Sequence, residues 1–170
     1  DSYMFHTPAI EMAQLQAEAM ALPIIFKTTK GEKEKELSDL KKALLEAKEK
    51  FQIEGIVTGA LYSTYQRDRI ELLCDQLGLK IFAPLWHKEQ ELEMQELLGN
   101  GFKFIFTAIA AEGLDDSWLN KIITIKELEK LKQLKAKFGL NPSGEGGEFE
   151  SLVLDCPLFK RKIVLDEVET

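Results

Sequence analysis

Residues 55–85, GIVTGALYSTYQRDRIELLCDQLGLKIFAPL, decide the fold. The short apolar stretch 55–60 predicts a strand, and residues 80–85 predict a second one. Between them a helix is predicted over about 64–77, from an apolar stripe at helical spacing: Ile70, Leu73, Cys74 and Leu77. Short apolar strands that alternate with helices are typical of a parallel sheet covered by helices on both faces. We therefore expect an α/β fold.

The sequence before this stretch extends the alternation. Thr7 is a suitable N-cap and Pro8 suits the first helical position, so a helix is predicted over about 8–22. Residues 22–29 predict a buried strand, and the leucine stripe of residues 37–50 predicts another helix. A doubly wound domain normally opens with a strand and its phosphate-binding loop, whereas this sequence opens on a helix. We therefore expect the N-terminal one or two βα units to be missing from it.

The character of the sequence changes from about residue 86. We predict a helix over 88–99, an apolar strand over 102–111, a loop with a short helix over 113–124, and a helix that ends near Gly139. Two β segments follow, at 149–157 and 158–168. This order is typical of a smaller α+β lobe. With a boundary at about 80–86, the predicted domains are residues 1–82 and 83–170.

The composition limits the classes of function. The chain has 170 residues, of which 45% are hydrophobic and 30% charged, as in ordinary globular proteins. Its net charge of -7 and its pI near 5.0 argue against broad binding to nucleic acids or anionic membranes. No apolar run approaches the roughly 18 residues of a membrane span, and no signal peptide opens the sequence. We expect a cytoplasmic location.

Cysteines and histidines are too scattered to indicate a metal centre or a nucleophilic triad. Cys74 and Cys156 lie far apart and have no Cys or His at ligand spacing. His6 and His87 are equally isolated. We expect two buried thiols and no metal site.

The first candidate site lies where the strand 55–60 meets the following helix. Ser63 opens an S-x-x-Q capping box, and in an open α/β sheet ligands bind at such a junction. Arg67 lies only about 20° from Cys74 around the helix, so it faces inward. A charged side chain there binds an anion or pairs with a carboxylate, and both alternatives stay open. Gly59 and Ala60 either leave room for a ligand or make a tight turn.

The second candidate site is NPSGEGGEFESLVLDCP, residues 141–157. Within seven of these positions lie three glycines and three glutamates: Gly144, Glu145, Gly146, Gly147, Glu148 and Glu150. A mobile loop ahead of a strand is one interpretation, because glycine permits positive φ. The carboxylates repel phosphate and suit a cation or a positively charged substrate, which favours a functional loop. In an extended conformation, Glu148 and Glu150 point to the same face.

Four segments make the sequence similar to a known family. They are SYMFHT (2–7), GALYSTYQRDRIE (59–71), GLDDSWLNK (113–121) and GEGGEFESLVLDCPLFKRKI (144–163). They closely resemble the diphthine ammonia ligase family, also called diphthamide synthases, among the N-type ATP pyrophosphatases. The resemblance covers essentially the whole chain. It implies a Rossmann-like parallel sheet of the adenine nucleotide alpha-hydrolase-like group, followed by the smaller lobe.

The resemblance also implies an activity. In that family, ATP, together with Mg²⁺, adenylates the carboxylate of diphthine, a modified histidine of elongation factor 2, and ammonia displaces AMP to give diphthamide. Residues 1–82 are then the remainder of a nucleotide-binding domain, and residues 83–170 bind the substrate. The family's S-G-G-K-D-S phosphate loop is absent from this sequence, in line with the missing leading strand. We therefore expect this chain to bind nucleotide poorly or not at all.

Residue roles follow from the same resemblance. The residues expected beside the nucleotide are Gly59, Ala60, Ser63, Tyr3 and His6. Arg67 is expected to act in catalysis on an anion, either phosphate or the acyl-adenylate. The residues expected beside the substrate are Tyr65, Gly144, Gly146 and Gly147.

The charges of the reactants suggest what the glutamates do. Diphthine carries a fixed trimethylammonium group, and ammonia arrives largely as ammonium. Glu145, Glu148 and Glu150 suit both cations, and we expect them to hold the quaternary ammonium or to deprotonate ammonium. Trp86 or Phe149 is expected to offer a cation–π face to the substrate.

Two other functions stay open. A noncatalytic adenine-nucleotide-binding protein of the same fold would form no AMP. An acyl-transferring or thiolating relative would act on tRNA, against which the net acidity and the lack of a catalytic Cys pair count. For the leading function, the expected partners are ammonium and elongation factor 2 carrying diphthine. We expect no direct contact with nucleic acid or membrane, and a homodimer is compatible with the sequence.

Overall fold

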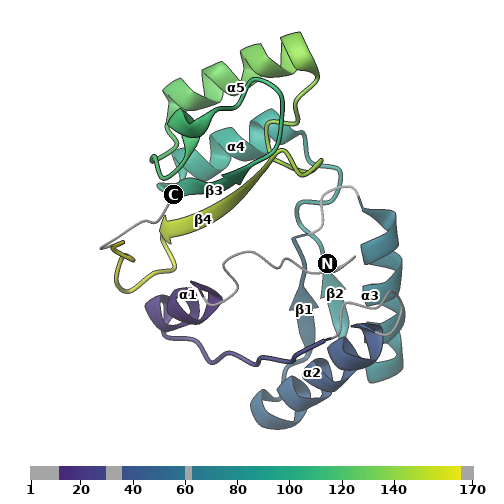
Figure 1. Ribbon diagram of the computed structural model, residues 1–170. Coiled ribbons are helices and arrows are strands. Elements are labelled where there is room, and N and C mark those ends of the chain that lie inside the picture. The colour runs from purple at the N-terminus through teal and green to yellow at the C-terminus, as the bar shows by residue number, and fades with distance from the viewer. Residues whose placement is uncertain (1–11, 30–35, 60–62, 166–170) are drawn as a thin grey trace. The chain divides into compact units, whose positions relative to one another are not determined.

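The computed structural model describes residues 12–29, 36–59 and 63–165 (Figure 1). The described residues form two compact units, one within residues 24–87 and the other made of residues 12–23 together with 88–165. The first described segment, residues 12–23, therefore belongs with the second unit. Within the described ranges, no helix is both long and apolar enough to cross a membrane.

The first unit is a small parallel α/β unit. Its elements are α2 (Glu36–Phe51), β1 (Gly55–Val57), α3 (Thr64–Leu77) and β2 (Lys80–Phe82). The two strands pair in parallel, with Ile56 opposite Ile81, and α3 connects them. The strand, helix and second strand predicted within residues 55–85 are confirmed. The α/β fold class is confirmed with them.

One face of this sheet carries the core of the unit. Ile56 and Ile81 pack there against side chains of α2 and α3, and the buried members of this core are Leu44, Leu73, Cys74, Leu77 and Leu79. Val57 and Phe82, on the opposite face, are 73% and 64% exposed. The helices that the structure describes therefore cover one face, not both as predicted. Alternation along two three-residue strands turns only the two isoleucines toward α2 and α3.

Residues 22–29 form no strand, so that prediction is wrong. Leu22, Ile24 and Phe26 are 56%, 40% and 50% exposed, and no described strand pairs with the segment. An apolar run becomes a strand only where a neighbouring strand satisfies its backbone N–H and C=O groups. The segment is held instead by an ion pair, because Nζ of Lys27 lies 2.5 Å from Oε2 of Glu46 on α2.

The second unit is of the predicted α+β type. Its elements are α1 (Met12–Met20), α4 (Gln90–Gly99), β3 (Lys103–Ile109), the 3-10 helix η1 (Asp116–Trp118), α5 (Ile125–Phe138) and β4 (Phe149–Asp155). β3 and β4 pair antiparallel, with Ile109 opposite Phe149. In Figure 1, α4 and α5 lie on the same side of this sheet. The core between them surrounds the fully buried Phe106.

α1 packs against β4 and the segment that follows it. Nε2 of Gln16 donates to the carbonyl of Val153 over 3.0 Å, and the N–H of Lys160 donates to the carbonyl of Ala19. Residues 158–165 consequently form no strand, so the predicted β segment 158–168 is wrong over its described part. A turn closed by the N–H of Phe159 on the carbonyl of Cys156 directs the chain to the end of α1. The N–H of Ile163 then donates to the carbonyl of Leu154 on β4 over 2.8 Å, but no ladder of such bonds forms.

Candidate functional site

The junction between β1 and α3 is built as the capping box predicts. Ser63 has extended backbone geometry, and its Oγ accepts a hydrogen bond from the N–H of Gln66 over 3.3 Å, so α3 begins at Thr64. No described atom lies within 4 Å of the position that a Cβ on Gly59 would occupy. The junction thus places the N-terminus of a helix, which carries a partial positive charge, beside an open backbone at Gly59, and this suits an anion.

Arg67 pairs with a carboxylate, one of the two alternatives left by the sequence. Its Nε donates to Oε1 of Glu71 over 2.6 Å, one helical turn along α3. Its guanidinium carbon also lies 4.8 Å from the centroid of the Trp86 ring. Trp86 therefore offers a cation–π face to an arginine of its own unit. The Arg67 side chain keeps 38% of its surface exposed, so the pair does not bury its charge.

A second arginine near this helix start contacts an aromatic ring of the same helix. The guanidinium carbon of Arg69 lies 3.5 Å from the centroid of the Tyr65 ring, and its Nη1 donates to the carbonyl of Tyr65 over 3.3 Å. The structure thus pairs each arginine with an aromatic ring in a cation–π contact, Arg69 with Tyr65 and Arg67 with Trp86. The other residues predicted beside the nucleotide, Tyr3, His6 and Ala60, lie outside the described residues.

In the second unit, the glycine-rich loop that precedes β4 is tightly wound. Two turns follow one another, closed by the N–H of Gly144 on the carbonyl of Asn141 and by the N–H of Gly147 on the carbonyl of Gly144, both at 3.0 Å. Gly144 and Gly147 have φ values of 79° and 82°, which favour glycine. A Cβ on Gly144 would also lie 2.8 Å from Cε2 of Phe149. These contacts define the loop conformation and require its glycines.

Glu148 holds this loop together. Its Oε1 accepts from the N–H of Asn141 over 3.0 Å and its Oε2 accepts from the N–H of Gly146 over 2.7 Å. Its own carbonyl accepts from the N–H of Ala110 over 2.8 Å. The residue precedes β4, and its carboxylate folds back onto the loop. The sequence predicts that Glu148 and Glu150 share one face of an extended segment. β4 begins at Phe149, so Glu148 lies outside the strand and that prediction does not apply to it.

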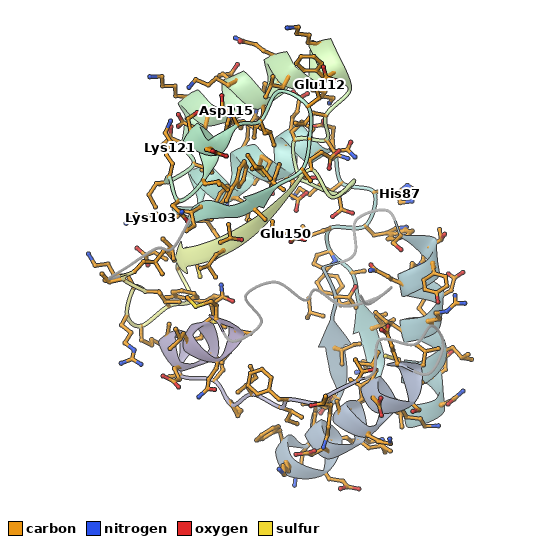
Figure 2. The ribbon with its side chains drawn as sticks, viewed as in Figure 1. His87, Lys103, Glu112, Asp115, Lys121 and Glu150 are labelled. Carbon is orange, nitrogen blue, oxygen red and sulfur yellow. The ribbon has the colours of Figure 1, made fainter. Side chains whose placement is uncertain are left out.

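The other two glutamates differ from Glu148. The pKa of Glu145 is raised by partial burial of the Glu145 carboxyl and, next, by the negative charge of Glu148. Glu145 as a whole residue is nevertheless exposed. Glu150 lies within β4, opposite Ala108. Figure 2 shows its side chain on the side of the β3–β4 sheet away from α5. Neither carboxylate takes part in the two hydrogen bonds by which Glu148 holds the loop.

Phe149 belongs to the core of the second unit. Its side chain is 7% exposed, and its ring stacks on that of Phe106 with centroids 3.8 Å apart. The prediction that Phe149 offers a cation–π face to the substrate is therefore wrong. The alternation along β4 turns Phe149 toward α4 and α5 and Glu150 away from them.

Sequence reasoning missed a set of buried polar atoms on α4 and in the loop. Oε1 of Gln90, Oε2 of Glu93 and Oγ of Ser143 are buried, and none has a hydrogen-bond partner among the described residues. Glu93 is only 9% exposed; its burial, and next the charge of Glu145, raise its pKa. One signal was available in the sequence, because Glu93 directly precedes the buried Met94 in the apolar part of α4.

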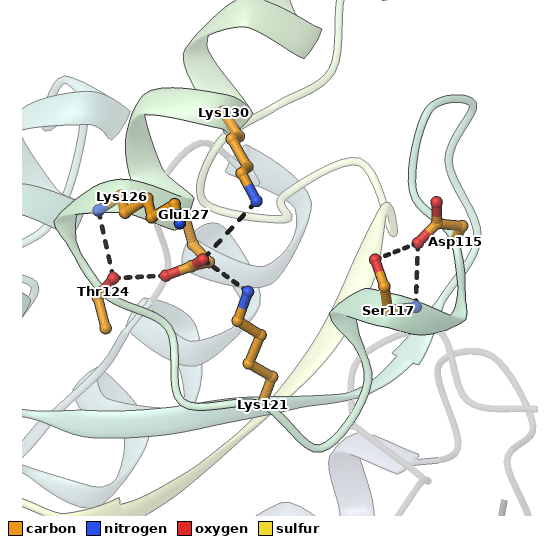
Figure 3. A network of polar contacts seen from close by, with 7 residues as sticks. All are labelled: Asp115, Ser117, Lys121, Thr124, Lys126, Glu127 and Lys130. Atoms are coloured by element: carbon orange, nitrogen blue, oxygen red, sulfur yellow. Dashed lines mark hydrogen bonds and ion pairs between the residues drawn. The ribbon is translucent and has the colours of Figure 1, made fainter.

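A second buried carboxylate has a structural role (Figure 3). Glu127 is 2% exposed and lies in the first turn of α5, whose N-cap is Thr124. It accepts hydrogen bonds from Oγ1 of Thr124 and, over 2.7 Å, from Nζ of Lys121. Lys121 first, and then Thr124, lower the pKa of Glu127 to about 2. The T-x-x-E spacing of a capping box at 124–127 is the sequence signal for this anchor.

The two cysteines are buried, as predicted. Cys74 is 1% exposed and Cys156 is 8% exposed, and burial raises the pKa of the Cys74 thiol above its ordinary value. In the part of the chain that the structure describes, no group of three or more His, Cys, Asp and Glu side chains is arranged to hold a metal ion.

A parallel α/β unit with a capped helix start, together with an α+β unit that carries an acidic glycine loop, defines a two-unit α/β protein. The family model for the diphthamide synthase N-terminal domain matches residues 1–81, and the model for the diphthamide synthase C-terminal domain matches residues 89–170. The chain therefore belongs to the diphthamide synthase family, which confirms the resemblance inferred from the four segments.

Individual relatives agree with the family assignment. The mouse protein is 42% identical over 182 residues, which are 99% of this chain and 67% of the relative. The human protein is 40% identical, with the same two coverages of 99% and 67%. A relative from Schizosaccharomyces pombe is 37% identical over 99% of this chain and 30% of its own length. All three carry the name diphthine–ammonia ligase.

Proposed function

We propose that the protein is an ATP-dependent carbon–nitrogen ligase that converts diphthine on elongation factor 2 to diphthamide. The observation that carries this proposal is the similarity to proteins named diphthine–ammonia ligase, which extends over 99% of the chain at 37–42% identity. That range includes both candidate sites. The two units would divide the work, with residues 1–82 beside the nucleotide and residues 83–170 beside the diphthine-bearing substrate.

Two bonds are exchanged in the proposed reaction. A carboxylate oxygen of diphthine attacks the α-phosphorus of ATP and pyrophosphate leaves, which gives an acyl-adenylate. Ammonia then attacks the carbonyl carbon, AMP leaves with the carboxylate oxygen, and a proton is lost from nitrogen. The open backbone at Gly59 and the capped start of α3 suit the phosphate, and Arg67 stands one turn into that helix. Mg²⁺ would accompany the phosphates of ATP.

The acidic loop suits the positive charge of both reactants. Diphthine carries a fixed trimethylammonium group, and ammonium must lose a proton before it attacks. Glu145 and Glu150 are the candidates for these tasks, because Glu148 uses both carboxylate oxygens within the loop. A carboxylate whose pKa is raised, as that of Glu145 is, suits proton transfer better than an ordinary glutamate.

AMP formation tests this proposal. The purified protein, with its intact mass measured, is incubated with ATP, Mg²⁺, ammonium and elongation factor 2 carrying diphthine. From a protein that carries the phosphate loop, with a mass well above 19.3 kDa, we expect AMP and diphthamide in equal amounts, and neither product when ammonium or diphthine is left out. At a mass of 19.3 kDa, the 170-residue chain without that loop is expected to form neither product. Nucleotide binding without AMP would instead favour the noncatalytic adenine-nucleotide-binding alternative. Modification of tRNA added to the same mixture would favour the tRNA-directed alternative. Size-exclusion chromatography with light scattering tests the predicted homodimer.

Two variants separate the roles of the candidate sites in this assay. Glu145→Gln keeps the size of the side chain and removes its charge, so we expect slower amidation at saturating ATP. Glu112→Gln makes the same change at an exposed position of the second unit and serves as the matched control (Figure 2). Equal rates for both variants and the unchanged protein would remove Glu145 from the proposed mechanism.

A further inference from the structure

Two elements of the first unit meet at the guanidinium of Arg67. Helix α3 supplies Arg67 itself and, one turn along, Glu71, whose Oε1 accepts from Nε of Arg67 over 2.6 Å. The chain after β2 supplies Trp86, whose ring centroid lies 4.8 Å from the guanidinium carbon. The guanidinium is therefore held by a carboxylate at one edge and by an aromatic ring against one face.

The sheet topology places these contacts where open α/β sheets bind ligands. β1 and β2 are parallel, and α3 leads from the carboxyl end of β1 back to the amino end of β2. The start of α3 and the chain that leaves β2 consequently lie at the same edge of the sheet, its carboxyl edge. A turn fixes Trp86 there, because its N–H donates to the carbonyl of Ala83 over 3.2 Å.

The bond to Glu71 leaves most of the hydrogen-bond donors of Arg67 unused. A guanidinium carries its N–H groups on Nε, Nη1 and Nη2 in one plane. Among the described residues, the Arg67 side chain donates to Glu71 through Nε alone. Nη1 and Nη2 thus keep the forked geometry with which arginine binds a phosphate group through two hydrogen bonds.

A comparison with another ion pair of this unit shows what is particular to Arg67. Lys50 and Glu46 on α2 form a pair of the same spacing and the same length, 2.6 Å, but the Lys50 side chain is 60% exposed and that of Arg67 only 38%. Contact with a second element restrains the Arg67 side chain, so less rotamer freedom is lost when it binds an anion. We propose that Glu71 and Trp86 are positioning residues that hold the guanidinium of Arg67 for a phosphate group.

This inference rests on the proposed function, because the phosphate group is that of the nucleotide or of the acyl-adenylate. It deepens that function by giving a task to two residues that need not touch the anion themselves. The negative charge of Glu71 on its own would weaken anion binding at Arg67. If Glu71 nevertheless strengthens such binding, the gain comes from the position that it gives the guanidinium.

Two substitutions of Glu71 separate position from charge. Glu71→Ala removes both the charge and the acceptor, whereas Glu71→Gln removes the charge and keeps an amide oxygen that can accept from Nε. AMP is titrated into the isotope-labelled 170-residue protein, at concentrations high enough to detect weak binding, and the Nε–Hε resonance of Arg67 is followed by NMR. We expect severalfold weaker binding in Glu71→Ala and undiminished binding in Glu71→Gln. Asp75→Ala, at an exposed position of the same helix, is the matched control and is expected not to weaken binding.

Trp86 is tested in the same titration. Trp86→Leu removes the aromatic face, and Trp86→Phe keeps one, so we expect severalfold weaker binding of AMP in the first variant and a smaller loss in the second. Equal affinities of Glu71→Ala and Glu71→Gln would overturn the role of Glu71, and equal affinities of the two Trp86 variants would overturn that of Trp86. An Arg67 resonance that does not respond to AMP would overturn both.

Failure of this inference is distinguishable from failure of the proposed function. Diphthamide formation by a protein whose Glu71→Ala and Trp86→Leu variants bind AMP normally would refute the positioning roles alone. AMP binding that depends on Glu71 and Trp86, in a protein that carries the phosphate loop but forms no diphthamide, would refute the proposed function alone.

Discussion

The loop at 141–148 and the junction between β1 and α3 are both candidate sites, yet different interactions hold them. The loop depends on its backbone: Gly144 packs against Phe149, and Glu148 accepts from two loop N–H groups. At the junction, exposed side chains pair with one another, as Arg67 does with Glu71, beside an open backbone at Gly59. Substitutions of Gly144 and Glu148 are therefore expected to change stability first, whereas substitutions at the junction are expected to leave stability nearly unchanged.

Gly144→Ala is expected to have the largest effect. A methyl group there meets the Phe149 ring and forces an alanine into a positive φ, so we expect the free energy of unfolding to fall by about 2–4 kcal/mol. Urea unfolding followed by circular dichroism measures this. The matched control is Gly59→Ala at the junction, where no described atom is near, with an expected change within about 0.5 kcal/mol. Equal losses at both glycines would contradict the difference between the two regions.

Glu127→Gln tests a buried carboxylate whose role is structural alone. We expect a loss of about 1–3 kcal/mol near neutral pH, because Lys121 loses its charged partner. The pKa of Glu127 is about 2 in the folded protein, below its ordinary value of 4.5. Its contribution is therefore present above pH 4.5 and is lost as the pH falls toward 2. Urea unfolding at a series of pH values should show the difference shrinking over that range; a constant difference would contradict the assignment.

Glu148→Ala and Glu145→Ala sharpen the comparison within the loop itself. Removal of the Glu148 carboxylate leaves the N–H groups of Asn141 and Gly146 without their acceptor, so we expect a loss of about 1–2 kcal/mol. Amide hydrogen exchange at Gly146 should accelerate in that variant. Glu145→Ala is expected to change stability by less than about 0.5 kcal/mol, because this exposed residue closes no turn. Similar exchange rates in the two variants would argue against the anchoring role of Glu148.

Arg67→Gln is expected to have the smallest effect on stability. Its ion pair with Glu71 is an exposed pair one turn apart, worth about 0.5 kcal/mol or less. The proposed anion role nevertheless predicts roughly tenfold weaker binding of AMP or ATP, as expected for one lost charge-assisted hydrogen bond. Equilibrium dialysis measures this. A large loss of stability together with unchanged nucleotide affinity would assign Arg67 to structure and not to function.

Helix α3 shows what could be predicted locally. Its start after Ser63 and its end before Gly78 follow from capping and from the apolar stripe, which depend on neighbours within a few positions. The two predicted strands that the structure lacks show what could not be predicted locally. Residues 22–29 and 158–165 are apolar enough for strands, but a strand also needs a partner, and the partner is chosen elsewhere in the chain.

The candidate sites also contain residues that local sequence indicates and residues that only the fold reveals. The residues of the acidic loop could be found from the sequence because glycines and glutamates are densely clustered there. The orphaned oxygens of Glu93 and Ser143 could not, since burial depends on how α4 and the loop meet. The stacking of Phe149 on Phe106 likewise depends on the pairing of β4 with β3.

The sequence by itself therefore determined the family, the α/β class, the helix boundaries and the location of both candidate sites, because these depend on residue type and local spacing. Only the tertiary structure decided which carboxylate does what. Glu148 anchors the loop, Glu127 anchors the first turn of α5 to Lys121, and Glu93 lies buried without a partner among the described residues. Three chemically identical side chains differ because the free energy of a carboxylate depends on the donors and solvent around it, and folding brings these together from distant parts of the chain.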